Sequence, residues 1–295
     1  LSSSLSGWLP TLPTAPFGCS SYFGLDNETG ELLHGRILDF PLQGSFDANE
    51  RILLTQWTNG PKVVSFGSAG FPFPSITAMS ERGVSLALHQ KFTDVFNPDG
   101  QMIFDFVDDF LQEVSDISSA LEFLKNHQTL TTWCLHVGFD TGKAGDSPKV
   151  LEVDIMGNEF VYRTHEITSD KILHFHNQLI QEPEKQQQYL PYGIDSYNQM
   201  RADKAQKKCE RQQKKKRQNA ESLLKEITTL EKISRKKNAQ WQLDSITPSS
   251  LMALVMTPRS GSFVANAGAA PKFFRGKMYE GKEFWKDTGN ENVRA

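Results

Sequence analysis

Short segments with strand-like residue patterns follow one another through most of this chain, and this succession limits the folds open to it. Two segments between them, residues 104–114 and 117–126, have the 3.6-residue apolar spacing and acidic outer face of amphipathic helices. Because strands and helices come in runs rather than in alternation, the pattern favours an α+β fold with antiparallel sheets over a βαβ array. The expected strands are residues 19–25, 32–38, 52–57, 62–66, 75–79, 84–89, 133–140, 149–154, 159–163 and 172–177, with strand-and-turn character again over 249–281.

The composition is that of a globular protein with a substantial core. The chain has 295 residues, of which 38% are hydrophobic and 11% aromatic, and this argues against a disordered chain. At about 100–200 residues per domain, one large domain or two small ones fit this length. No apolar run approaches the roughly 20 residues that span a bilayer, so we expect no transmembrane segment. Three cysteines cannot form a disulfide framework, and the odd number leaves at least one thiol unpaired within the chain.

Charge is distributed unevenly along the chain. The formal net charge is -3, yet residues 201–238 contain 14 Lys and Arg against 5 Asp and Glu. Residues 201–235 are rich in strong helix formers and hold no Pro or Gly, which predicts one helix, and we interpret the basic stretch as a solvated helical insertion. Such a segment could neutralise nucleic-acid phosphates, but it lacks interleaved aromatic residues and any recognisable nucleic-acid motif. We therefore expect no nucleic-acid partner, and contact with an anionic membrane surface stays open as an alternative.

Residues 1–18 are expected to form a leader, and residues 19–295 a single domain. The leader is rich in Ser and Pro, and up to residue 25 the only ionisable side chains are those of Cys19 and Tyr22. There is no initiator Met and no charged region ahead of it, so we do not interpret it as an intact signal peptide. We expect a propeptide, and this slightly favours an exported protein.

The residues that follow this leader can carry out nucleophilic chemistry. Cys19 begins the sequence CSS, and HGRILDF at residues 34–40 lies across a hairpin turn, so Arg36 and Asp39 should return beside the start of the first strand. A cysteine attacks as the thiolate, which a nearby guanidinium stabilises, and an aspartate can hold an ammonium group. Cleavage after Gly18 would free the α-amine of Cys19, which could act as a general base near neutral pH. One residue would then supply both nucleophile and base.

These motifs resemble those of the N-terminal-nucleophile cysteine amidases: the choloylglycine hydrolases, the penicillin acyltransferases and especially the acid ceramidase/N-acylethanolamine amidase group. MSERGVSLAL at residues 79–88 is similar to the family's Met-Asn-Glu-Lys-Gly-Leu turn and strand. Residues 149–154 and 172–177 resemble the strands that end at the family's oxyanion asparagine. DSYNQMR at residues 195–201 resembles the Asn-Ser-x-x-Arg segment that opens a helix. The similarity runs in chain order over residues 18–208, with a weaker echo in the tail.

The resemblance implies an αββα sandwich, in which two antiparallel sheets pack face to face between layers of helices. Matched by position, Cys19 would be nucleophile and α-amine base, Arg36 would polarise the thiolate or the substrate, and Asp39 would orient the α-amine. The Asn177 amide would donate to the tetrahedral oxyanion, and Arg201 would complete the polar cluster. The same site would first cut the chain between Gly18 and Cys19.

Two positions depart from the family pattern. Ile37 follows the arginine where the family usually has Asn, and Gln90, or His89 after a slip of one position, stands where the family often has a second Asn. Gln90 and His89 are therefore weaker candidates for oxyanion or substrate contacts. The departures leave open a catalytically silent, unprocessed member that acts by binding.

The expected activity is hydrolysis of a linear amide C–N bond in an N-acylated small molecule through a Cys19 thioester, with no metal or organic cofactor. The Phe-Pro-Phe-Pro sequence at residues 71–74 could line a site for an apolar acyl group. His174 and His176 on one strand face, near His165, invite a metal interpretation, but no further ligand lies at a convincing spacing. Cys134 is expected to be a buried structural residue, and Cys209 an incidental one.

Overall fold

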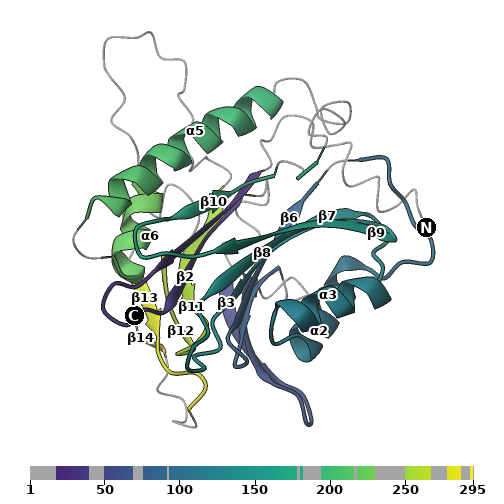
Figure 1. Cartoon of the computed structure of the whole chain (residues 1–295), viewed down its shortest axis with the longest axis horizontal. Helices are drawn as coiled ribbons and strands as arrows, with labels where there is room; N and C mark the ends of the chain where they lie inside the picture. Colours follow the sequence, from purple (N-terminus) through teal and green to yellow (C-terminus); the bar gives the residue numbers. More distant parts are fainter. Residues whose placement is uncertain are drawn as a thin grey trace.

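Two antiparallel sheets of seven strands each make up the centre of the molecule (Figure 1). In this computed structural model the described residues are 18–39, 50–68, 76–91, 93–177, 180–181, 194–215, 218–229, 250–266, 278–286 and 293–294. Most of the expected leader, residues 1–17, and the Phe-Pro-Phe-Pro sequence at 71–74 lie outside them.

Sheet A, the first of the two, has the strand order β10-β1-β2-β11-β12-β13-β14. It begins with the predicted hairpin, in which β1 and β2 pair with Gly18 opposite Asp39 and Leu25 opposite Leu32. Its strands are β1 (Gly18–Leu25), β2 (Leu32–Asp39), β10 (Leu173–Phe175), β11 (Ser250–Thr257), β12 (Ser262–Asn266), β13 (Met278–Gly281) and β14 (Val293–Arg294).

Sheet B has the strand order β3-β4-β5-β6-β7-β8-β9, so each strand pairs with its neighbour in the sequence. Its strands are β3 (Glu50–Gln56), β4 (Lys62–Ser68), β5 (Thr77–Ser80), β6 (Val84–Gln90), β7 (Thr132–Phe139), β8 (Lys149–Met156) and β9 (Glu159–Glu166). The described helices are α2 (Ile103–Glu113), α3 (Ile117–Asn126), α5 (Ile194–Gln213) and α6 (Ala220–Thr228).

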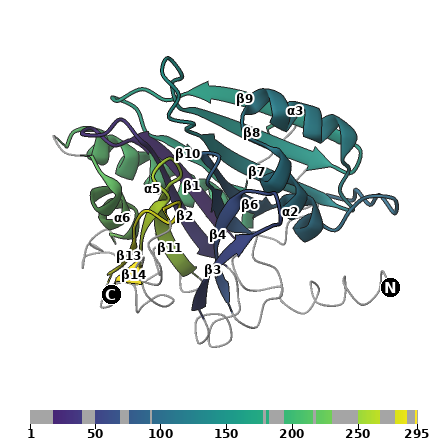
Figure 2. The ribbon, with the colours of Figure 1, turned by 90° about the horizontal axis from the view of Figure 1, so that it is seen from below.

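The molecule has four layers, because each sheet is apolar on both faces and buries one face against helices and the other against the second sheet. Phe106 and Phe110 of α2 and Phe123 of α3 pack on Leu86 and Leu135 of sheet B. On the opposite side of the molecule, α5 and α6 cover the outer face of sheet A, and Figure 2 shows the two helix pairs on either side of the strands. The inner faces of the sheets meet in further apolar clusters. The expected αββα sandwich is confirmed.

The basic segment differs from the expected single helix. It forms two helices, because the Asn219 side chain accepts a hydrogen bond from the backbone of Ser222 and the Ser222 side chain bonds back to Asn219, a capping box that starts α6 anew. The expectation of a solvated segment is also wrong for one face of α5, which packs on sheet A. Lys208 on that face is fully buried and donates from Nζ to the Ile227 carbonyl at 3.1 Å. None of the helices in the described ranges is long and apolar enough to cross a membrane.

Candidate active site

Cys19 lies at the start of β1, in the layer between the two sheets. Its side chain is 7% exposed and packs in an apolar cluster with Leu38 of β2 and Met79 of β5. Successive side chains of a strand point to opposite faces, so the next residue, Ser20, faces the helix layer, where it contacts α5. The thiol of Cys19 is therefore directed toward sheet B.

Arg36 brings a positive charge to this thiol. Cys19 pairs with Leu38 across the hairpin, so Arg36, two positions earlier in β2, lies diagonally opposite Cys19 on the same face. Its Nη2 donates to Cys19 Sγ at 3.1 Å and to the Leu88 carbonyl at 2.7 Å, and its Nη1 lies 2.7 Å from Nε2 of His89. Arg36 is fully buried, and a buried guanidinium beside sulfur stabilises the thiolate.

Asn177 reaches the same residue from β10. That strand pairs antiparallel with β1, which brings the residues just after β10 beside the beginning of β1. The backbone N–H of Cys19 donates to Asn177 Oδ1 at 2.6 Å, and Asn177 Nδ2 donates to the Gln90 carbonyl at 2.9 Å. One side-chain amide thus connects the nitrogen of Cys19 to the end of β6 in sheet B.

Asp39 and Arg201 form a buried ion pair beside this group. Asp39 Oδ2 lies 2.8 Å from Arg201 Nη2, Ser250 donates to Asp39 Oδ1, and Arg201 Nη2 also donates to Ser20 Oγ at 3.2 Å. Burial raises the pKa of Asp39 to about 6, against the opposing influence of Arg201, Ser250 and Arg36. The ion pair is linked to the Cys19 group through Ser20, the next residue in the chain.

The two weaker candidates occupy different positions. Gln90 contributes its backbone carbonyl to Asn177, and its side chain is partly buried. His89 is fully buried and lies next to Arg36. Its Nε2 is also 2.8 Å from Ser21 Oγ and 3.0 Å from His136 Nδ1. Burial lowers the pKa of His89 well below its usual value, and His136 and Arg36 act in the same direction, so the ring is neutral.

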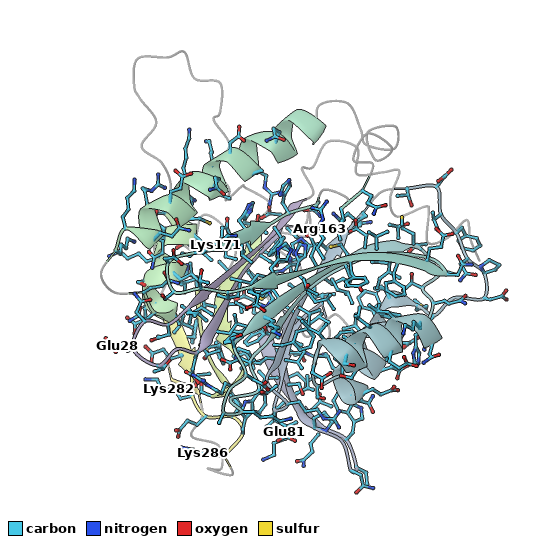
Figure 3. The ribbon with its side chains drawn as sticks, in the orientation of Figure 1. Glu28, Glu81, Arg163, Lys171, Lys282 and Lys286 are labelled. Carbon is cyan, nitrogen blue, oxygen red and sulfur yellow. The ribbon has the colours of Figure 1, made fainter. Side chains whose placement is uncertain are left out.

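A second group of contacts, which sequence reasoning missed, holds the chain on the far side of Asn177. Asp154 of β8 accepts from the Ile180 N–H at 2.5 Å and lies 3.6 Å from Lys91 Nζ. Arg163 of β9, labelled in Figure 3, donates to the Ile180 carbonyl at 2.8 Å. The signal available in the sequence was polar residues within the expected strands, such as Asp154 and Arg163, and it also applies to Ser21 and His136.

The remaining sequence candidates lie away from this cluster or within the core. Cys134 is fully buried, and burial raises the pKa of its thiol well above the usual value. Burial likewise raises the pKa of Cys209 to about 12. The rings of His174 and His176 stack with centroids 5.5 Å apart. Within the described ranges, no group of three or more His, Cys, Asp or Glu side chains is arranged to hold a metal ion.

Comparison with known proteins gives no match among family models and none among curated proteins. Solved structures do match. An N-acylethanolamine-hydrolyzing acid amidase ortholog from Caenorhabditis elegans superposes with a TM-score of 0.51 at 14% identity, covering 82% of this chain and 93% of that one. A mutant of the conjugated bile acid hydrolase from Clostridium perfringens superposes with a TM-score of 0.52 at 10% identity, covering 94% and 95%.

The chain has the N-terminal-nucleophile hydrolase fold. This agrees with the resemblance seen in the motifs and confirms it at the level of the fold. Three of the residues that suggested the N-terminal-nucleophile hydrolases meet at one end of the β1–β2 hairpin, where Arg36 contacts the sulfur of Cys19 and Asn177 contacts its nitrogen.

Proposed function

We propose that this chain is an N-terminal cysteine hydrolase that cleaves a linear amide C–N bond in an N-acylated small molecule. The observation that carries the proposal is the group around Cys19, whose sulfur accepts from Arg36 and whose nitrogen donates to Asn177. Nucleophile, charge partner and amide group come from β1, β2 and the end of β10, and all three are buried. Sites built on packed strands hold their geometry well, as acyl transfer requires.

In the proposed reaction the thiol proton of Cys19 is held by its own α-amine, and the thiolate attacks the substrate carbonyl carbon. A C–S bond forms, and the carbonyl oxygen becomes an oxyanion that accepts a hydrogen bond from the NH2 group of Asn177. The α-ammonium then protonates the leaving nitrogen as the C–N bond breaks. Water gives a proton to the α-amine and attacks the thioester carbonyl carbon. The C–S bond breaks, which releases the carboxylic acid and returns Cys19 to its starting state.

We propose the same chemistry for removal of the leader. Sγ of Cys19 attacks the carbonyl carbon of Gly18, the Gly18–Cys19 bond breaks as its nitrogen takes up the thiol proton, and water hydrolyses the resulting thioester. Two features support this step: Gly18 is held in the sheet opposite Asp39, and the nitrogen of the bond to be cut is already held by Asn177. The released α-amine would then be near the ion pair of Asp39 and Arg201.

The surroundings of Cys19 favour an apolar acyl group. Leu38, Val64, Phe66, Met79 and Met252 belong to the same apolar cluster as Cys19. The two similar structures are described as hydrolases of N-acylethanolamines and of conjugated bile acids, which also combine an apolar acyl part with an amine. We therefore propose lipid-like amides as the first substrates to examine.

The proposal is tested by intact mass and by turnover of the purified full chain. Wild type should lose residues 1–18 and hydrolyse at least one of N-acylethanolamines, ceramides, conjugated bile acids and acyl-amino acids. Cys19→Ala should do neither, and Cys209→Ala, a buried cysteine on α5, should do both. A wild-type chain that retains its leader and hydrolyses none of these amides would favour the silent binding protein instead. Turnover by Cys19→Ala would mean that the nucleophile is another residue.

A further inference from the structure

Nε2 of His89 lies at the meeting point of three side chains. Arg36 Nη1 is 2.7 Å away, Ser21 Oγ 2.8 Å and His136 Nδ1 3.0 Å. All four residues are fully buried, so these groups must satisfy one another.

The donors and acceptors of this group fix the position of the proton on His89. Arginine carries only N–H donors, so the 2.7 Å contact requires an unprotonated Nε2, and neutral His89 then carries its hydrogen on Nδ1. His136 Nδ1 can donate to the same atom, while His136 Nε2 faces Cys134 Sγ at 3.2 Å. Burial raises the pKa of Cys134, so it stays a thiol, and both His136 and Asp154 lie within hydrogen-bond reach of its one S–H group. His89 Nδ1, which carries the hydrogen, has no hydrogen-bond partner among the described residues.

His89 is also an important restraint on Arg36. The Nη2 group of Arg36 is shared between the Leu88 carbonyl and the thiol, while Nε has no hydrogen-bond partner among the described residues. The remaining nitrogen, Nη1, is held by His89. Without His89 Nε2 as acceptor, the guanidinium would be held only by the Leu88 carbonyl and the sulfur of Cys19. The buried N–H groups of Nη1 would then lose their hydrogen-bond acceptor.

We infer that His89 is a positioning residue, which holds the Arg36 guanidinium against Cys19 through an unprotonated Nε2 and does not itself contact substrate. This gives His89 a role different from the oxyanion contact considered for it from the sequence. Its effect on catalysis rests on the proposed function, whereas its effect on the state of the Cys19 thiol does not.

The first test compares His89→Leu, which removes the acceptor at similar volume, with His89→Gln, whose Oε1 can take the place of Nε2. His34→Leu is the matched control, because His34 is equally buried but bonds to Ser85. The readout is the rate at which iodoacetamide alkylates Cys19 in the full chain, followed by peptide mass over a range of pH. A hydrogen bond to a charged group corresponds to about 10–100-fold in an equilibrium.

His89→Leu should alkylate at least about 10-fold more slowly at neutral pH, while His89→Gln and His34→Leu stay within about 3-fold of wild type. On an amide substrate, His89→Leu should lower kcat with little change in KM. An unchanged alkylation profile in folded His89→Leu would overturn the inference. If no amide is hydrolysed by wild type but the alkylation effect is present, the proposed function fails and the positioning role stands.

The second test needs no variant that might fold poorly. In wild type labelled with 15N-histidine, His89 should show a protonated Nδ1 and an unprotonated Nε2 throughout the pH range in which the chain stays folded, with His89→Gln used for assignment. A hydrogen found on Nε2 of His89, or a ring that becomes doubly protonated, would contradict the inference whatever the outcome of the alkylation experiment.

Discussion

Asn177 and Cys19 are separated by 158 positions in the sequence, yet Oδ1 of Asn177 lies 2.6 Å from the backbone nitrogen of Cys19. The contact arises because β10 joins sheet A beside β1. The same amide donates to the Gln90 carbonyl of sheet B, so Asn177 fixes the nucleophile's nitrogen relative to both sheets.

Asn177→Ala should lower kcat/KM by about 10²–10³, because a donor to the oxyanion and the acceptor for the Cys19 nitrogen are lost together. Removal of residues 1–18 should slow by a similar factor, which intact mass over time will measure. Asn126→Ala, at the exposed end of α3, is the control and should match wild type. Equal turnover by the two variants would exclude Asn177 from the reaction.

Arg36→Lys should reduce kcat/KM by at least about 10-fold although the charge is kept. A guanidinium reaches Cys19, Leu88 and His89 with nitrogens in fixed directions, which a single ammonium group cannot reproduce. Arg36→Met should lose more activity, because the charge that stabilises the thiolate is removed as well. Steady-state kinetics of both variants provide the measurement, and full activity of Arg36→Met would contradict the proposed role of the charge.

Activity should rise with pH through an inflection near pH 6. The pKa of buried Asp39 is about 6, so at lower pH the carboxyl is neutral and can no longer hold Arg201 or an α-ammonium group as a charge partner.

The same carboxyl makes the stability of the fold depend on pH. Since the pKa of Asp39 is above the usual 3.8, the folded state favours its protonated form. The stability from Asp39 is therefore fully present below pH 3.8 and is lost as pH rises through about 6.

The kcat/KM profile of Asp39→Asn distinguishes this assignment from others. The variant should be less active and should lack the inflection near pH 6, because its amide does not titrate. If the inflection remains in place in Asp39→Asn, another group is responsible for it.

Asp154→Asn should destabilise the fold by about 3–5 kcal/mol, because the buried Lys91 ammonium loses the Asp154 carboxylate that lies 3.6 Å from it. The Asn amide oxygen can still accept from the Ile180 N–H, but it lacks the negative charge that strengthens this hydrogen bond, so Ile180 should be held less firmly and kcat should fall. Urea unfolding gives the free energy. In the double variant Lys91→Met, Asp154→Asn much of the stability should return. A double variant as unstable as the single one would contradict the explanation by loss of this ion pair.

Local structure was predictable wherever turn residues and periodicity agreed. The expected helix over residues 117–126 has the observed bounds of α3, and the hairpin of β1 and β2 followed from the turn between two strand patterns. The break between α5 and α6 was not expected, because no Pro or Gly precedes it. Asn219 ends the run by capping a new helix, which competes with continuation of the old one.

Within the candidate site, the sequence by itself determined the pair that one hairpin brings together. Cys19 and Arg36 are 17 positions apart, and pairing across a short turn places them on the same face of neighbouring strands. The motif resemblance also named Asn177, Arg201 and, more weakly, His89, but only the tertiary structure decided what each of them contacts. Asn177 after β10 bonds to the Cys19 nitrogen, His89 of sheet B contacts Arg36, and Arg201 of α5 bonds to Ser20. The physical reason is that strand periodicity fixes which face a side chain takes, whereas sheet order and the packing of layers fix what it meets there.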